Sequence, residues 1–209
     1  AFWNAPLGID LHEKMACEAS LKMHKALKKL NEERKKEAEQ NNSVFLELKI
    51  GIGINTGNCV VGNMGSEQRF DYSVLGDSVN LASRLEGQSK GYGVKTIIGS
   101  ETYETLKNEF AILKLDLIAV KGKKEAVAIY TLLGNNELKN QNSFKDLELK
   151  HNLMLNSYFN QNWLEASKKL KECENLLNGV MKEYYNMMNV RLEKFLKNPP
   201  PKNWDGVFI

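Results

Sequence analysis

The sequence has few of the features that mark disulfide-rich, zinc-binding or membrane-spanning proteins. Its three cysteines, Cys17, Cys59 and Cys173, lie far apart without a Cys-x-x-Cys pair, which argues against a disulfide framework or a zinc site. No run of about 18 apolar residues occurs, so no segment is expected to cross a membrane. No signal peptide is visible. These absences favour a reducing, cytoplasmic location.

The charge shows little excess of either sign. Lys and Arg total 29 and Asp and Glu total 26, a net charge of +3, with both signs interspersed. The basic stretch 25–36 also contains Glu32 and Glu33, so it indicates a solvated helix face and no nucleic-acid partner. The three histidines, His12, His24 and His151, are scattered and are predicted to be surface or capping residues.

Hydrophobic periodicity predicts an α+β fold, a ferredoxin-like two-layer domain of sheet and helices over residues 1–134. Residues 1–4 are predicted to be part of a strand. The predicted elements that follow are a helix over 9–39, strands over 45–52, 59–64 and 69–75, a helix over 77–89, a strand over 94–98, a helix over 100–106, and strands over 110–120 and 126–133.

The remaining residues form a different region. The Asn-rich stretch 135–143 is predicted to be a linker, and 144–209 a small α-helical extension with two or three helices over 144–197. Residues 158–166 weakly resemble a tetratricopeptide repeat, although one unit cannot form a solenoid alone. The Pro-rich end is expected to be extended, with Trp204 and Phe208 docked on a surface.

The most informative run is residues 69–86, RFDYSVLGDSVNLASRLE. Apolar and polar residues first alternate as in a half-buried strand, and Gly76-Asp77 then ends the strand and starts a helix. Asn80 and Arg84 are four residues apart and share one face of that helix, while Val79, Ala82 and Leu85 are expected to cover the buried side. Such a unit is suited to a ligand with a polar ring and an anionic group.

This run closely resembles the signature of class III nucleotide cyclases, the adenylate and guanylate cyclase catalytic domain, and it is most similar to the bacterial form. The stretches IGIGINTG at 50–57, VVGNMGS at 60–66 and AFWNAP at 1–6 resemble further parts of that domain, in the family's order. The resemblance covers residues 1–134 and implies that the N-terminal part of the domain lies upstream of residue 1.

The resemblance implies an adenylate cyclase that converts ATP to 3′,5′-cyclic AMP and pyrophosphate in signal transduction. It implies catalytic roles for Arg84, which pairs with phosphate oxygens, and Asn80, which orients the ribose. It also implies substrate-binding roles for Ser73, at the purine-reading position, and Lys121, at the terminal phosphates. Lys123 or Lys124 could share the role of Lys121.

The family's two metal-binding aspartates and its purine-reading lysine fall upstream of this chain. Asp10, Asp71 and Asp77 do not match those positions, so no metal ligand is assigned, although the resemblance implies Mg²⁺ or Mn²⁺ as cofactor. In the family the site forms between two catalytic domains. We therefore expect a homodimer in which this chain supplies one half of the site, and inactivity of the chain alone. The sequence leaves open whether the parent protein is anchored to a membrane through an upstream region, as bacterial relatives with a similar C-terminal tail often are.

Two other functions remain open. A guanylate cyclase is the first, because Ser73 differs from the Asp or Thr common in adenylate cyclases. The second is a non-catalytic, cyclase-like regulatory or dimerisation module. In that case Arg84 would form a surface ion pair with Glu86 or another acidic residue, Ser73 would have no ligand, and Lys121 would belong to an ordinary hairpin turn. A dinucleotide loop at 51–57 is rejected, because the spacing is G-x-G-x-x-x-G and no helix follows.

Overall fold

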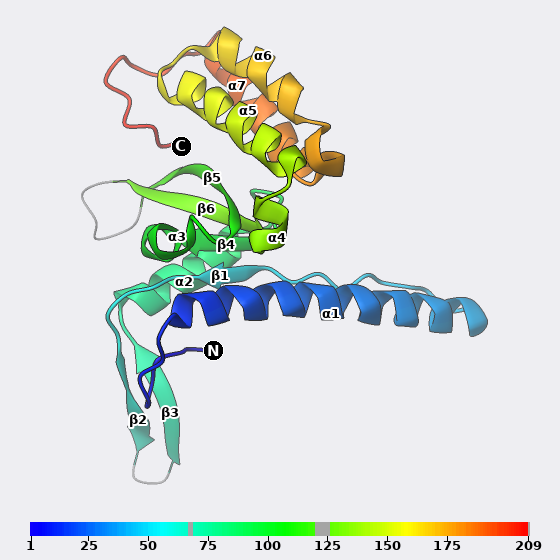
Figure 1. Ribbon diagram of the computed structural model, residues 1–209, viewed down its shortest axis with the longest axis vertical. Coiled ribbons are helices and arrows are strands. Elements are labelled where there is room, and N and C mark those ends of the chain that lie inside the picture. The colour runs from blue at the N-terminus through cyan, green and yellow to red at the C-terminus, as the bar shows by residue number, and fades with distance from the viewer. Residues whose placement is uncertain (67–68, 120–125, 209) are drawn as a thin grey trace.

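The computed structural model describes residues 1–66, 69–119 and 126–208. At its centre is a four-stranded sheet with the strand order β1-β4-β6-β5 (Figure 1). These strands are β1 (Ile52–Ile54), β4 (Thr96–Gly99), β5 (Ala111–Ile118) and β6 (Val127–Gly134). The pairing is parallel between β1 and β4 and antiparallel elsewhere. The predicted α+β fold class is confirmed.

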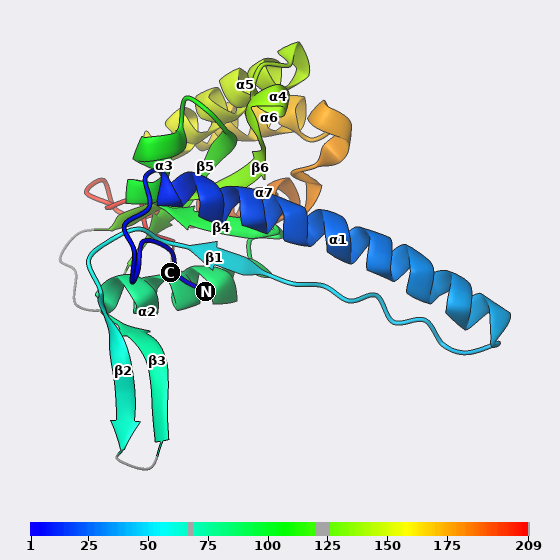
Figure 2. The same ribbon diagram turned by 60° about the horizontal axis from the view of Figure 1, so that its bottom comes forward.

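Helices cover both faces of this sheet, because alternate strand residues point to opposite sides. Ile98 of β4 packs in a cluster with Cys17 of α1 (His12–Gln40) and Leu106 of α3 (Ser100–Leu106). Its neighbour Ile97 packs in a separate cluster with Leu85 of α2 (Asp77–Gln88). Figure 2 shows α1 and α2 on opposite sides of β1.

The C-terminal helices extend the cluster on the α2 face. They are α4 (Asn136–Lys139), α5 (Asn142–Phe159), α6 (Trp163–Cys173), the 3₁₀ helix η1 (Leu176–Gly179) and α7 (Lys182–Lys197). The three long helices lie beside β5 and β6 (Figure 1). Trp204 packs on rings of α5, α6 and α7, as the sequence predicted. The stretch 135–143 is not an extended linker, because it contains α4 and the start of α5.

Strands β2 (Val60–Ser66) and β3 (Arg69–Leu75) form a separate two-stranded antiparallel sheet. This hairpin projects away from the body of the molecule (Figures 1 and 2). The first residue of α2 follows the end of β3 after a single residue, Gly76, so the hairpin connects directly to the helix that carries Asn80 and Arg84.

Two predicted strands are wrong. Residues 1–4 form no strand, and of the predicted strand 45–52 only the last residue belongs to β1. Residues 43–51 instead run beside α1, where Asn31 Nδ2 donates to the Leu48 carbonyl at 2.8 Å and Arg34 donates to the Leu46 carbonyl at 2.9 Å. Side chains of the helix bind the backbone carbonyls that a neighbouring strand would otherwise bind.

The prediction that His151 lies on the surface is also wrong. Its side chain is fully buried between β5 and α7, and Nε2 lies 2.6 Å from the carbonyl oxygen of Lys114, which can only accept a hydrogen bond. Nε2 therefore carries the proton, and Nδ1 accepts from the Tyr185 hydroxyl at 2.9 Å. Burial lowers the pKa of His151 to about 4, so the ring is neutral at physiological pH.

Candidate active site

Gly76 makes the turn that joins β3 to α2. Its φ of +153° is a conformation that side chains disfavour, and a Cβ atom there would lie 3.1 Å from the Asn58 carbonyl oxygen. The Gly76 carbonyl accepts from the backbone N–H groups of Val79 and Asn80, at 3.1 and 3.2 Å, and so starts the helix. A glycine here places Asn80 in the first turn of α2.

Asn80 and Arg84 lie on the exposed side of α2, four residues apart on one face, as predicted. Neither side chain hydrogen-bonds or pairs with any other residue in the described part of the chain (1–66, 69–119, 126–208). The surface ion pair between Arg84 and Glu86 that the sequence left open does not form there. The Arg84 guanidinium is thus available to an external anion.

On the opposite side of α2, Leu85 is the one predicted residue that is fully buried. Leu81 and Leu85 are buried, while Val79 and Ala82 are only partly buried. The helix approaches β1 so closely that a Cβ atom on Gly53 would lie 2.1 Å from the Ala82 carbonyl oxygen. The glycines of the 51–57 run, rejected above as a dinucleotide loop, therefore allow α2 to pack directly on the sheet backbone.

The loop after β1 fixes the start of α2, a contribution that the sequence analysis missed. Asn55 Nδ2 donates to the Ser78 carbonyl at 3.1 Å. Gly57, with a φ of +156°, leaves room for Ser78, since a Cβ atom there would lie 2.2 Å from its hydroxyl oxygen. Thr56 shares a hydrogen bond of 2.8 Å with Thr102 of α3. The Asn-Thr-Gly run was the available signal for this anchoring.

Ser73 lies in β3, half-buried, opposite Gly62 of β2 in the antiparallel register. A Cβ atom on Gly62 would meet nothing within 4 Å, so space is open beside this part of the hairpin. The Ser73 hydroxyl has no hydrogen-bond partner within residues 1–66, 69–119 and 126–208. Ser73 precedes Gly76 by three residues, so the hairpin and α2 carry Ser73, Asn80 and Arg84 on one continuous unit.

The described residues do not include every part of the predicted site. Lys121 lies outside the described residues. In the ranges 1–66, 69–119 and 126–208, no group of three or more His, Cys, Asp or Glu side chains is placed to hold a metal ion. The residues that the structure describes do not make a metal site, and no chemical step is assigned to a metal on this chain.

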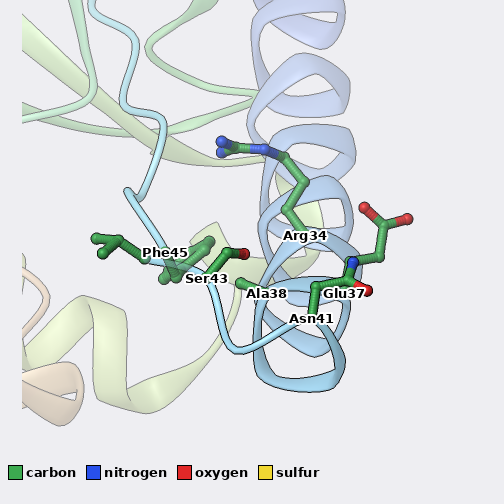
Figure 3. A pocket seen from close by; sticks show the side chains of 7 residues that line it. Arg34, Glu37, Ala38, Asn41, Ser43 and Phe45 are labelled. Atoms are coloured by element: carbon green, nitrogen blue, oxygen red, sulfur yellow. The ribbon is translucent and has the colours of Figure 1, made fainter.

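A pocket at the far end of α1 is separate from these residues. Figure 3 shows Arg34 and Glu37 of α1 with Asn41, the residue after the helix, on one side, and Phe45 of the extended segment on the other. Arg34, one of the polar residues that line the pocket, already donates a hydrogen bond to the Leu46 carbonyl. None of the candidate site residues lines it.

Comparison with known proteins agrees with this geometry. Residues 6–134, more than half of the chain, match the family model of the adenylate and guanylate cyclase catalytic domain. Adenylate cyclase 1 of Rhizobium meliloti (strain 1021) is 34% identical over 134 residues, 64% of this chain and 19% of that protein. Adenylate cyclase of Anabaena cylindrica is 37% identical over 118 residues, 55% of this chain and 23% of that protein.

Among solved structures, the guanylyl cyclase Cya2 is similar with a TM-score of 0.55 and 32% identity, over 66% of each chain. The chain spans about a fifth of the length of the two curated relatives.

This chain belongs to the class III family of adenylate and guanylate cyclases and contains a nucleotidyl cyclase catalytic domain. Cyclase domains of this family bind nucleotide, dimerise and typically use a divalent metal. No helix within the described ranges is both long and apolar enough to span a membrane.

Proposed function

We propose that this domain is part of an adenylate cyclase that converts ATP to 3′,5′-cyclic AMP and pyrophosphate. The observation that carries the proposal is that exposed Arg84 and Asn80 lie on one face of α2 and that neither side chain binds another described residue. The names of the two curated relatives, both adenylate cyclases, support ATP as the substrate.

The reaction joins the ribose 3′-oxygen to the α-phosphorus. The 3′-hydroxyl loses its proton, the bond between the α-phosphorus and the bridging oxygen breaks, and pyrophosphate leaves. Negative charge gathers on phosphate oxygens in the transition state, so a preorganised cation lowers the barrier. The guanidinium of Arg84 suits this role because its planar fork binds two oxygens at once. Asn80, one turn earlier, holds the ribose so that its 3′-oxygen faces the α-phosphorus.

Ser73 and Lys121 complete this half of the site. A hydroxyl both donates and accepts, so Ser73 serves the N1 or 6-amino group of adenine. Lys121 binds the terminal phosphates. The aspartates that would hold the metal ions, Mg²⁺ or Mn²⁺, and the purine-reading lysine would lie on another polypeptide segment, and we propose that a homodimer brings the two halves together. The product is a cyclic-nucleotide signal.

The test is a cyclase assay on the full-length protein, with ATP and GTP offered separately in the presence of Mn²⁺. We expect cyclic AMP from ATP, and a loss in kcat of about 10²–10³-fold in Arg84→Ala, as for removal of one transition-state donor. Lys90→Ala removes another exposed cation shortly after the same helix and should leave the rate unchanged. Normal activity of Arg84→Ala would refute the role of Arg84.

Guanylate cyclase is the second candidate, favoured by the similarity to the guanylyl cyclase Cya2. Formation of cyclic GMP from GTP in the same assay, with little product from ATP, would establish it. The roles of Asn80 and Arg84 would stand, and only the proposed contact of Ser73 with adenine would change. No product from either nucleotide in a folded dimer would favour the non-catalytic module.

A further inference from the structure

A buried carboxylate connects the C-terminal helices to the turn that follows α2. Asp116 of β5 is 1% exposed, and three groups donate to its side chain. Oδ1 accepts from the Leu117 N–H at 2.9 Å, while Oδ2 accepts from the Tyr92 hydroxyl at 2.7 Å and from the Arg191 guanidinium. Charge-assisted bonds of this kind stabilise a buried anion strongly. The carboxylate thus holds β5, the turn after α2, and α7 together.

The turn after α2 touches α7 at a second point. Tyr92 is 5% exposed, and its N–H donates to the Gln88 carbonyl at the last residue of α2, so its position is tied to the helix end. The next residue, Gly93, has a φ of +63°, and a Cβ atom there would lie 2.4 Å from Cβ of Glu183 in α7. The turn therefore lies directly against α7 at both Glu183 and Arg191.

Arg191 is held in place by more than its ion pair. Its guanidinium carbon lies 5.4 Å from the centre of the Tyr92 ring and 4.4 Å from that of Phe208, near the C-terminus. Burial alone would lower the pKa of Arg191, but Asp116 and Tyr92 outweigh it and raise the pKa above its ordinary value. The cation is therefore permanently charged and fixed between two rings.

We propose that Arg191 is a positioning residue for the cyclase site, acting through Asp116 and Tyr92 to fix the end of α2 and with it Arg84. This inference rests on the function proposed above. The start of α2 is anchored by Asn55 and Gly76, and Ala82 and Glu86 rest on Gly53 of β1. Among the described residues, the turn beyond Gln88 joins the end of the helix to α7. Release of the turn from α7 would let the last turn of α2, which follows Arg84, shift on the sheet, and misplacement of a catalytic group by about 1 Å costs on the order of 10²-fold in rate. The C-terminal helices are thereby part of the catalytic apparatus.

The experiment compares two hydroxyl deletions in the full-length protein. Tyr92→Phe removes the bond to Asp116. Tyr184→Phe removes a buried bond of 2.7 Å to the Leu115 carbonyl in the same α7–β5 interface, and this bond involves no residue of the turn after α2. We expect both to lower Tm, but only Tyr92→Phe to lower kcat, on the order of 10-fold, with KM for ATP nearly unchanged.

A double-mutant cycle with Arg84→Lys separates positioning from general destabilisation. If Tyr92 acts through Arg84, the effect of Tyr92→Phe on kcat shrinks in the Arg84→Lys background, because the misplaced group is already altered. An equal loss in both backgrounds, or an equal loss of kcat in Tyr92→Phe and Tyr184→Phe, would overturn the proposal.

Failure of the proposed function has a different signature, namely a folded wild-type protein that cyclises neither ATP nor GTP. Amide hydrogen exchange then tests, independently of activity, whether the contacts of Tyr92 hold the end of α2. Faster exchange across α2 in Tyr92→Phe than in Tyr184→Phe supports the connection between α7 and α2. Equal exchange in the two variants overturns it.

Discussion

Gly53 of β1 lies against the backbone of Ala82 in α2, so that a Cβ atom on the glycine would come within 2.1 Å of the alanine carbonyl oxygen. The same Cβ atom would lie 2.4 Å from the Glu86 backbone nitrogen. The helix thus rests on the sheet with no side chain between them. This close contact fixes the height of α2 over the sheet and turns Asn80 and Arg84 towards solvent.

Gly53→Ala should therefore displace α2. The clash involves backbone atoms that cannot rotate away, and overpacking of this kind costs about 1–3 kcal/mol of unfolding free energy. Gly87→Ala is the matched control, because a Cβ atom on Gly87 meets nothing within 4 Å and alanine favours the helix by up to about 1 kcal/mol. Urea denaturation measures both, and a Gly53→Ala protein as stable as Gly87→Ala would contradict the close packing.

Ser73→Ala should weaken the use of ATP without affecting the fold. Loss of one hydrogen bond of about 1 kcal/mol to adenine lowers kcat/KM by roughly 5-fold. Because Ser73 is half-buried and bonded to no described side chain, Tm should not change. Kinetics with ATP and GTP measure the effect, and an unchanged ratio of the two kcat/KM values would show that Ser73 does not read the base.

Acid should destabilise the protein through His151. Its pKa is about 4 in the folded state and about 6.5 when the chain is unfolded, so the unfolded state binds one more proton between these values. Stability is then complete above pH 6.5 and falls as the pH decreases towards 4. The expected loss between pH 7 and pH 5 is about 2 kcal/mol.

His151→Gln isolates this effect, because glutamine retains polar groups but does not titrate. Urea denaturation at pH 7 and pH 5 should show a smaller difference for the variant than for the wild type, even though the variant is less stable at pH 7. Equal pH dependence in the two proteins would mean that other groups cause the acid sensitivity.

Trp204→Ala should loosen the C-terminal segment. The indole ring lies 5.3 Å from the Phe195 ring and 5.7 Å from the Trp163 ring, and its N–H donates to the Val207 carbonyl at 2.7 Å. Loss of this partly buried ring should cost about 2–3 kcal/mol. Trp204→Phe keeps most of the packing and should lose less. Thermal unfolding and proteolysis near the C-terminus report the difference, and resistance equal to wild type would contradict docking.

Local features of the sequence predicted strand β3 and helix α2 well. Strand 69–75 and the helix that starts at Asp77 follow from alternation, from Gly76 and from helical spacing, all of which act over a few residues. Asn80 and Arg84 were placed on one exposed face for the same reason. Lys121, also predicted, lies outside the described residues, so its role stays a prediction.

Interactions between distant parts of the chain could not be predicted. Alternating residues at 45–52 indicate a strand, but side chains of α1 bind that backbone and only the end pairs with β4. The contact between Asp116 and Arg191 joins residues 75 positions apart, and neither has a local signal. The burial of His151 likewise depends on Lys114 and Tyr185, which lie on other elements.

The end of the family domain in the sequence is not the end of the folded core, because the sheet and the C-terminal helices share one hydrophobic cluster. Similarity to the family ends at residue 134, but Leu113, Leu115 and Ile129 of the sheet pack in one cluster with Phe144 and Tyr184 beyond that point. A protein cut after residue 134 would expose those sheet residues to water and would tend to aggregate. The shortest piece of this chain suitable for expression is therefore longer than the part that matches the family and includes α5 to α7.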